Sequence, residues 1–563
     1  MLVSVFFFVA IGALMARAVQ LQIFEDSRLA GKASRQYEWS RTQQPRRGAI
    51  CDRNLSALAL SVKIESICAY PRLIGEKEAT AKALSNTLGI NQKELLCKLK
   101  SQKRFVWIKR HVGLKEAAKV AELNLPGIDF VKENRRFYPN KGLAAQLVGF
   151  TDIDGCGLEG LENEFDSTLK GKPINDTILK DAMGRIFTDS AQETKPINGY
   201  NLVLTLDKNI QYIAENALAE AISAHNAKGG MAIVVAPKTG ELLAVANLPG
   251  YNPNIFWKSV PANRRNHVFT DTFEPGSTFK VFLAATALAA GSLTPESTFY
   301  CENGVYSIGR NTIHDVHKFG WLSLQDIIKK SSNIGAVKIG QKLDREYLDL
   351  SLRKFGFGQQ SGVNVPSEAS GVLRPYNRWT NIDAATVCFG QGVSVTVFQL
   401  AMALSAIANN GTLMKPILVK EIIDDKGNVV NRYEPTPIRQ VVSPEIAHTI
   451  TQILTTVVAE GGTGTKASLQ DFAVAGKTGT AQKAEIGAKG YAVKKYVSSF
   501  IGFVPADDPE VTIVVAIDEP QGQIYGGVVA APVFQKISKE ILRYLNVIPT
   551  KGLMVSDETR QTS

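Results

Sequence analysis

The hydrophobic pattern of the chain is most pronounced at its beginning, where residues 2–16 form an unbroken apolar run. Arg17 interrupts the run, and mostly apolar residues then continue to Phe24. Crossing a bilayer takes about 20 residues, a length that is reached if the Arg17 side chain extends back to the interface. The pattern predicts an uncleaved membrane anchor over residues 1–24. A cleaved signal peptide is the alternative, although no basic segment precedes the run.

A second apolar segment, residues 281–290, is hydrophobic on every side and therefore predicts a buried helix. A Pro-Gly turn precedes this helix, and Gly291 is suited to end it. Ser277 and Lys280 lie three residues apart at the start of the helix. They should therefore share one face of its first turn.

The rest of the chain contains both strand and helix patterns. Apolar runs of strand length and residue preference predict strands, and longer amphipathic or capped segments predict helices. The predicted strands are residues 202–206, 230–236, 241–247, 473–481, 497–504 and 511–517, and the predicted helices include residues 79–88, 92–99, 208–224, 396–409 and 532–545. Strands near both ends of a region whose middle is mainly helical indicate an α+β fold, with a sheet packed by helices.

A polar stretch with Pro and Gly at residues 195–200 marks a domain boundary. The predicted organisation is an anchor at 1–24, an N-terminal domain at 25–196, a larger domain at 197–545 and a tail at 546–563. The tail lacks a core pattern and is predicted to be disordered.

The 563 residues have an ordinary globular composition, with 45% hydrophobic and 21% charged residues. The net charge of +11 is compatible with nucleic acid, an anionic membrane surface or an acidic polymer as partner. No zinc-finger, RNA-binding or helix-turn-helix pattern occurs, which argues against nucleic acid. None of the six cysteines belongs to a Cys-x-x-Cys pair, so the sequence predicts scattered, mostly buried thiols with room for one disulfide.

Ser277 and Lys280 together indicate nucleophilic catalysis. A serine hydroxyl is a weak nucleophile until a base removes its proton. A lysine in an apolar environment has a lowered pKa and can be that base. The free N–H groups at the start of the helix can stabilise a developing oxyanion.

Two later motifs, Ser331–Asn333 and Lys477–Gly479, follow the Ser-x-x-Lys motif in the chain. In this order the three motifs resemble the signature set of the penicillin-binding proteins and serine β-lactamases. The middle residue of the second motif is Ser332, where Asp also occurs in that set. Little consequence is expected, because the flanking Ser and Asn are the residues that face the site in the family.

The N-terminal part resembles the membrane-proximal domain of class B penicillin-binding proteins. The similar stretches are residues 45–54, 135–139, 144–150 and 155–162. The resemblance covers almost the whole chain and is greatest to the septal cell-division transpeptidases (the FtsI type). It implies the penicillin-binding transpeptidase fold, an antiparallel sheet packed by helices with a helical subdomain. It also implies an elongated pedestal (dimerisation) domain and a transmembrane helix.

The resemblance assigns catalytic roles to five residues. Ser277 would attack a carbonyl carbon, and Lys280 would take its proton. Ser331 and Lys477 would carry that proton to the leaving amine. Asn333 would bind the amide of the substrate peptide.

Substrate binding is expected along the third motif. In a strand, Lys477 and Gly479 point one way and Thr478 the other. The hydroxyls of Thr478 and Thr480 could bind a terminal carboxylate, helped by the charge of Lys477. Gly479, without a side chain, would let a substrate backbone lie alongside as an added strand. The resemblance further implies an oxyanion hole formed by the N–H groups of Ser277 and Thr480.

The implied reaction is peptidoglycan cross-linking without a cofactor or metal. A stem peptide ending in D-alanyl-D-alanine acylates the serine, D-alanine leaves, and an amine of a neighbouring stem takes the acyl group. β-Lactams would acylate the same serine. Expected partners are the membrane, a lipid II-polymerising glycosyltransferase and other division proteins. The expected location is the inner membrane, with a single span and the catalytic domain outside the cytoplasm.

Several alternatives remain open at this point. A β-lactamase needs a group that activates water for deacylation, and Glu368 is the nearest candidate by position, although its surroundings do not match that loop. A D,D-carboxypeptidase would use water in place of the amine, and an elongation enzyme would share the same chemistry. A non-enzymatic β-lactam sensor or divisome scaffold would not need the intact motifs.

His314 and His317 flank Asp315 and could suggest a metal. Two His and one Asp on a loop are too few and too irregular for a convincing metal site. We therefore expect these histidines at the surface or along a substrate groove.

Overall fold

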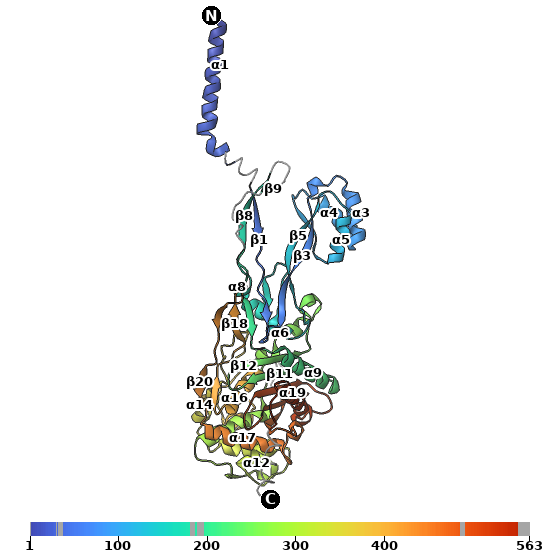
Figure 1. The fold of residues 1–563 in the computed structure, drawn as a ribbon. Coiled ribbons are helices and arrows are strands. Elements are labelled where there is room, and N and C mark those ends of the chain that lie inside the picture. Colours follow the sequence, from blue (N-terminus) through green and yellow to red (C-terminus); the bar gives the residue numbers. More distant parts are fainter. Residues whose placement is uncertain are drawn as a thin grey trace, which may run out of the picture. The chain divides into compact units, whose positions relative to one another are not determined.

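The computed structural model describes residues 2–29, 31, 38–180, 186–187, 196–484 and 490–549. The predicted disordered tail lies outside these residues from position 550 onwards. The chain forms two compact units (Figure 1). The N-terminal unit comprises Met1–Gly48, Ser61–Arg135 and Lys170–Tyr200, and the catalytic unit comprises Ala49–Leu60, Arg136–Leu169 and Asn201–Ser563.

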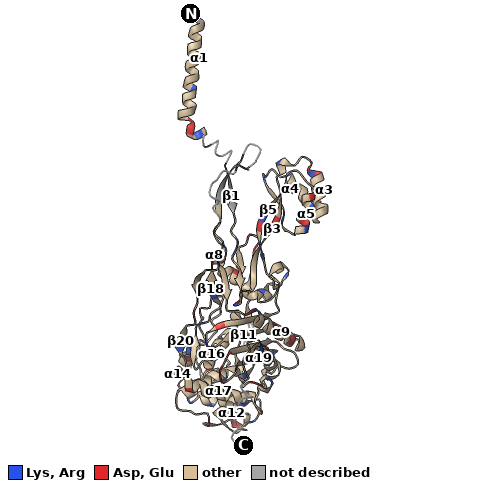
Figure 2. Ribbon diagram, in the orientation of Figure 1, with Lys and Arg blue, Asp and Glu red and all other residues tan. Residues whose placement is uncertain are grey.

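The N-terminal unit begins with helix α1 (Leu2–Val19), which continues as a π-helical turn, η1 (Gln20–Phe24). Of the described residues, only Val3–Phe24 form a helix long and apolar enough to cross a membrane. Figure 2 shows α1 almost without charged residues, and Arg17 is the basic residue of its last turn. Helix α1 runs through Arg17, so the interruption in the apolar run does not break it, and the Arg17 guanidinium donates to Gln20 Oε1 at 2.8 Å.

Two further parts complete the N-terminal unit. Strands β1 (Glu38–Gln43), β8 (Ile174–Lys180) and β9 (Ile186–Phe187) form an antiparallel sheet. The other part contains β3 (Ala57–Ala69), β4 (Val106–Val112), β5 (Ile128–Phe137), α3 (Lys77–Leu88), α4 (Gln92–Leu99) and α5 (Leu114–Glu122). Its core includes Leu84, Leu95 and Ile108. The two short helices predicted around Gly89 are confirmed, and Gly89 ends α3 with a φ of +67°.

The catalytic unit is built on a five-stranded antiparallel sheet in the order β12-β11-β23-β22-β21. The strands are β11 (Gly229–Ala236), β12 (Glu241–Leu248), β21 (Ala475–Ala484), β22 (Tyr491–Val504) and β23 (Val511–Asp518). All five correspond to predicted strands. Strand β21, which contains the Lys-Thr-Gly motif, lies at an edge of the sheet.

Helices cover both faces of this sheet because apolar side chains alternate along its strands. Helices α9 (Lys208–Ala224) and α19 (Ala531–Tyr544) cover one face, where Val234 belongs to their core. Helix α16 (Val397–Ala408) covers the other face, where Ile233 belongs to its core. The three helices match their predicted positions.

The helical subdomain surrounds α11 (Lys280–Ala289), the predicted buried helix. Its nine residues from Lys280 to Leu288 are all buried. The packing helices are α12 (Leu324–Lys330), α13 (Asn333–Gly340), α14 (Arg345–Lys354) and α17 (Pro444–Val458). The structure therefore confirms the α+β class and the helical subdomain.

The remaining elements are short. One group of short strands pairs in the order β19 (Val429–Arg432), β18 (Val419–Ile423), β10 (Asn201–Leu204) and β2 (Ile50–Cys51). The other short strands form two-stranded pairs: β6 (Phe150–Thr151) with β7 (Gly157–Glu159), β13 (Thr298–Tyr300) with β16 (Trp321–Ser323), β14 (Val305–Ile308) with β15 (Asn311–His314), and β17 (Thr412–Met414) with β20 (Pro437–Gln440). The short α-helices are α6 (Ala145–Val148), α7 (Gly160–Glu164), α8 (Asp166–Leu169), α10 (His267–Thr270), α15 (Asn381–Val387) and α18 (Gly526–Val529).

Residues 136–169 belong to the catalytic unit by their contacts, although the similarity to class B proteins places them in the membrane-proximal domain. A buried ion pair, Arg136 Nε to Glu162 Oε1 at 2.6 Å, holds this segment together. Tyr251 of the catalytic unit donates from its hydroxyl to Ala145 O at 3.0 Å. The domain boundaries at 24, 196 and 545 remain a prediction.

Candidate active site

Ser277 lies in a 3₁₀ turn, η5 (Gly276–Phe279), that leads directly into α11. Gly276 has a φ of +55° and donates its N–H to Gly390 O at 3.1 Å, so a second glycine-containing loop supports the turn. The turn places the Lys280 amine 3.1 Å from Ser277 Oγ. The sequence prediction that these two side chains share one face is confirmed.

The second motif meets the first through Lys280. Helix α12 ends before Ser331, which has a φ of +64°, and α13 begins at Asn333. Lys280 Nζ donates to Ser331 O at 2.7 Å, to Asn333 Oδ1 at 2.8 Å and to Ser331 Oγ at 3.3 Å. Left-handed backbone is costly for a residue with a Cβ, and here it turns the Ser331 hydroxyl towards the lysine.

The third motif completes the cluster. Lys477 Nζ donates to Ser331 Oγ at 2.9 Å and to Thr478 O at 3.3 Å. Lys280 and Lys477 are both fully buried. The Ser331 hydroxyl therefore lies between two buried amines, and both amines can exchange protons with it.

Burial controls the charge of these amines. Removal from water lowers the pKa of Lys280 to about 7, and the nearby Asp315 carboxylate partly opposes this shift. Burial and the neighbouring Lys280 lower the pKa of Lys477 well below its ordinary value. At neutral pH, an amine of this pair is therefore available to accept a proton from Ser277. A positive charge on Lys477 was expected from the sequence, whereas this environment favours its neutral form.

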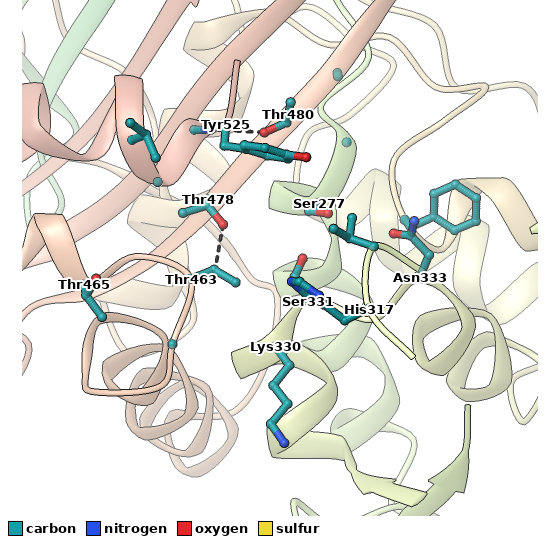
Figure 3. Close-up of a pocket in the computed structure, with 18 of the residues that line it drawn as sticks. Ser277, His317, Lys330, Ser331, Asn333, Thr463, Thr465, Thr478, Thr480 and Tyr525 are labelled. Carbon is teal, nitrogen blue, oxygen red and sulfur yellow. Dashed lines mark hydrogen bonds between the residues drawn. The ribbon is translucent and has the colours of Figure 1, made fainter. Parts of the chain in front are cut away.

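A cavity of about 760 Å³ opens in front of Ser277 (Figure 3). Ser277, Ser331 and Asn333 lie on one side, and Thr478 and Thr480 lie on the other. Further lining residues on the strand side include Thr463, Thr465, Tyr525 and Gly526. The described lining contains no Asp or Glu but includes two lysines, Lys330 and Lys466, and this charge favours an anionic ligand.

The hydroxyls on the strand side are held in place. Thr478 Oγ1 lies 2.9 Å from Thr463 Oγ1, and Thr480 Oγ1 accepts from Gly526 N at 3.0 Å (Figure 3). Lys477 does not line the cavity, whereas Thr478 and Thr480 do. The predicted alternation along this strand is thus observed.

Gly479 has a packing role that the sequence did not predict. A Cβ at this position would lie 2.4 Å from Ser499 Oγ and 2.7 Å from Thr278 Cγ2. Glycine is therefore needed because the strand packs tightly against the turn that contains Ser277. Contact with a substrate backbone remains a prediction.

Two residues of the site, Glu274 and Asp315, were given no role in the reaction by the sequence analysis. Glu274 accepts from Gly392 N at 2.8 Å and from the Tyr491 hydroxyl at 3.0 Å, which ties the Ser277 turn to two other segments. Asp315 accepts from the backbone at the start of α13. His317 lines the cavity, in agreement with a groove position. Such long-range pairs leave no local pattern in the sequence.

Glu368 lies outside the site. Its carboxylate accepts from Ser361 N at 2.8 Å and from Gly362 N at 3.3 Å, and it does not line the cavity. A deacylating role for this residue, as in a β-lactamase, is therefore not supported.

Comparison with known proteins agrees with this geometry. Residues 230–539 match the penicillin-binding protein transpeptidase domain, and residues 42–204 match the penicillin-binding protein dimerisation domain. The chain belongs to the class B penicillin-binding proteins. The resemblance first suggested by the three motifs is thus confirmed over both domains.

Two of the similar relatives are named as peptidoglycan D,D-transpeptidases, and a third is named as a sporulation protein. The chain is 36% identical to a probable peptidoglycan D,D-transpeptidase, PenA, of Neisseria meningitidis, covering 97% of this chain and 92% of the relative. It is 33% identical to the peptidoglycan D,D-transpeptidase FtsI of Escherichia coli, covering 96% and 90%. It is 35% identical to the stage V sporulation protein D of Bacillus subtilis, covering 91% and 81%.

Solved structures of penicillin-binding proteins share the fold. Penicillin-binding protein 3 of Mycobacterium tuberculosis in complex with aztreonam superimposes with a TM-score of 0.71 at 27% identity, covering 91% of this chain and 98% of that one. Penicillin-binding protein 2X of Streptococcus thermophilus gives a TM-score of 0.75 at 25% identity, covering 90% and 80%.

Proposed function

We propose that this protein is a peptidoglycan D,D-transpeptidase that works through an acyl-enzyme on Ser277. The observation that carries the proposal is the 3.1 Å contact between the Ser277 hydroxyl and the buried amine of Lys280, at the edge of an open cavity. A neutral amine at this distance can take the serine proton as the nucleophile attacks. The similarity to PenA and FtsI supports the same reaction.

In the acylation step, Ser277 Oγ attacks the carbonyl carbon between the last two D-alanines of a stem peptide. The serine proton passes to the Lys280 amine. When the tetrahedral intermediate collapses, the carbon–nitrogen bond breaks and the terminal D-alanine leaves. Its amine receives the proton through the Ser331 hydroxyl, which both lysines contact. Ser277 remains as an ester of the peptide.

In the second step, an amine of a neighbouring stem attacks the ester carbon. The ester bond to Ser277 breaks, an amide forms, and the amine proton returns to the serine oxygen through Lys280. The N–H groups of Ser277 and Thr480 are proposed to bind the oxyanion in both steps. Losing one such donor typically costs about 10²–10³ in rate.

Transfer to an amine is favoured over rapid hydrolysis. Among the described residues that line the cavity there is no carboxylate that could activate water. Thr478 and Thr480 present hydroxyls to the cavity, opposite Ser277, which supports binding of the terminal carboxylate of the stem peptide. Asn333 is proposed to bind the peptide amide on the opposite side.

A septal role is the proposed cellular function, supported by the similarity to FtsI. The protein would be anchored by α1 with its catalytic unit outside the cytoplasm. A lipid II-polymerising glycosyltransferase and other division proteins are the proposed partners. Imaging a fluorescent fusion tests this role: accumulation at midcell supports it, and a distribution along the side wall favours elongation.

Labelling with a fluorescent penicillin, followed by peptide mapping, tests the reaction itself. We expect a long-lived adduct on the peptide that contains Ser277. Rapid turnover of penicillin without an adduct would instead indicate a β-lactamase, and no reaction at all would favour a scaffold.

A further inference from the structure

Asp315, the residue that follows β15, lies outside the three motifs but is bonded to the second one. Its Oδ2 accepts from the Ser332 hydroxyl at 2.6 Å. Its Oδ1 accepts from Asn333 N at 2.5 Å and from Ile334 N at 3.1 Å. One carboxylate therefore binds a side chain and two backbone N–H groups of three consecutive residues.

These contacts fix the start of α13. The first N–H groups of a helix have no partner within the helix, and a carboxylate there also interacts favourably with the helix dipole. Ser332 is the N-cap residue, and its hydroxyl accepts from Gly335 N at 2.9 Å while donating to Asp315. The middle residue of the motif, which was expected to matter little, is thus the link between the motif and this carboxylate.

The start of α13 in turn positions the groups around Lys280. Asn333 Oδ1 accepts from the Lys280 amine at 2.8 Å, and its Nδ2 donates to His314 O at 3.0 Å. Ser331 precedes this start and has a left-handed backbone. An unfavourable backbone conformation persists only where neighbouring contacts enforce it.

We propose that Asp315 is a positioning residue of the acylation machinery, which holds Ser331 and Asn333 against Lys280 by anchoring the first turn of α13. This inference rests on the proposed function, because it concerns the same serine and the same lysine. Asp315 does not touch the substrate cavity in this role; it acts through the second motif.

The charge of Asp315 has a separate effect that a purely structural contact would not have. The carboxylate favours the protonated form of Lys280 and so raises its pKa, whereas burial lowers it more strongly. The two effects together give a pKa of about 7. The other buried amine beside Lys280 is that of Lys477, which shares the Ser331 hydroxyl. His317, Lys330, Lys466 and Tyr525 line the adjoining cavity.

Two substitutions in the full-length protein separate positioning from charge. Asp315→Asn removes the charge but retains an oxygen that can accept from the helix N–H groups. Asp315→Ala removes both. Second-order rates of acylation by a penicillin are measured between about pH 5.5 and 9, where neutral Lys280 becomes available.

In a plot of acylation rate against pH, the acid limb is the part where the rate falls as pH decreases. We expect Asp315→Asn to displace this limb towards lower pH, because the lysine loses a carboxylate that favours its protonation. Asp315→Ala should also lower the plateau rate by about tenfold or more, the equivalent of a lost charged hydrogen bond. Asp326→Asn is the matched control. Asp326 accepts from the Ser323 hydroxyl at the start of α12, away from Lys280, and its substitution should move neither the limb nor the plateau.

An acid limb that stays in place in Asp315→Asn, or a plateau that is unchanged in Asp315→Ala, would overturn the proposal. Histidines titrate in the same pH range and His317 lines the cavity, so the series is repeated with His317→Gln. If Asp315→Asn still displaces the acid limb in the His317→Gln background, the limb is assigned to Lys280. If the acid limb disappears in the His317→Gln background, this assignment is overturned. If Asp315→Ala does not fold in thermal melts, the plateau rate of Asp315→Asn decides, because an amide NH₂ in place of the second carboxylate oxygen cannot accept from the Ser332 hydroxyl.

The wild-type protein separates this inference from the proposed function. A wild-type adduct on Ser277 with unaffected Asp315 variants would refute the inference alone. Absence of any adduct on wild-type Ser277 would refute the acyl-enzyme function itself, and with it the role of Asp315.

Discussion

Two regions with different chemistry meet at Ser277. Behind the serine lies the lysine pair, Lys280 and Lys477, which is fully buried and shares the Ser331 hydroxyl. In front of it lies the cavity, where exposed side chains such as Lys330 and Tyr525 face open space. The first region excludes water, and the second admits it.

This difference separates proton transfer from recognition. Burial lowers the pKa of a lysine amine, so that the neutral form, which can accept a proton, is present near pH 7; an exposed lysine remains protonated there. Hydroxyls that bind a substrate carboxylate do not need a dry environment. We therefore expect substitutions behind Ser277 to cause large losses and substitutions in the cavity to cause graded ones.

The largest effect is expected where the two regions meet. Ser277→Ala should abolish the covalent penicillin adduct while leaving the fold intact, because the substitution removes the nucleophile and little volume. Mass spectrometry of the intact protein, with a thermal melt, measures both. An adduct that persists on the folded variant would place the nucleophile elsewhere.

A pair of neighbouring substitutions compares the two regions directly. Lys477→Ala should lower the second-order acylation rate by about 10²-fold or more, since it leaves the Ser331 hydroxyl without one of its partners. Thr478→Ser keeps the hydroxyl in the cavity and loses one methyl group, worth about 1 kcal/mol. Equal rates for the two folded variants would refute the division between the regions.

The pH dependence of the wild-type enzyme probes the buried region alone. Because burial lowers the pKa of Lys280 to about 7, the acylation rate should rise as pH increases through 7 and then level off. Well below this point the rate should fall about tenfold per pH unit, as the amine becomes protonated. A rate that is constant from about pH 5 to 9 would mean that no titrating base acts in acylation.

Gly479→Ala tests how tightly the strand and the serine turn are packed. The added Cβ would be closer than 3 Å to both Ser499 Oγ and Thr278 Cγ2, so these side chains, the strand or the turn must shift. Overpacking of this kind typically costs about 1–3 kcal/mol of stability. Thermal or denaturant unfolding measures this cost, and Gly250→Ala, where a Cβ would have only one neighbour at 3.7 Å, is the matched control. Equal stability of the two variants would contradict the tight contact.

The smallest effect on acylation is expected from removing the anchor. Deleting residues 1–24 should release the protein from the membrane fraction and leave its reaction with penicillin unchanged, because the motif residues all belong to the catalytic unit. Fractionation and acylation rates measure the two outcomes. A folded, soluble variant that no longer reacts would show that the N-terminal segment contributes to catalysis.

Much of the fold follows from the sequence because it is encoded locally. The buried helix α11, the five strands of the catalytic sheet and the cap of α9 by Asp207 all have periodic or capping patterns. The apolar N-terminal helix, which is long enough to cross a membrane, follows from length and composition alone. The contacts of residues 136–169 with the rest of the catalytic unit were not predictable, because they join segments far apart in the chain.

For the site, the sequence gives the motif residues but not the reasons for their positions. Order along the chain was enough to select Ser277, Lys280, Ser331, Asn333 and Lys477, and the structure brings these together. It could not show that Gly479 is required by packing, because Ser499 and Thr278 are distant in sequence. Nor could it connect Asp315 with the second motif, since that contact depends on how a loop folds back onto a helix.

The left-handed backbone of Ser331 limits which sequences could encode this enzyme. Threonine offers the same hydroxyl, but its branched Cβ is poorly tolerated at a φ of +64°. Glycine adopts this backbone freely but has no hydroxyl to place between the two lysines. Few single substitutions at position 331 would therefore preserve the reaction if β-lactam treatment selected for changes there. Cavity residues such as Tyr525 tolerate more substitutions.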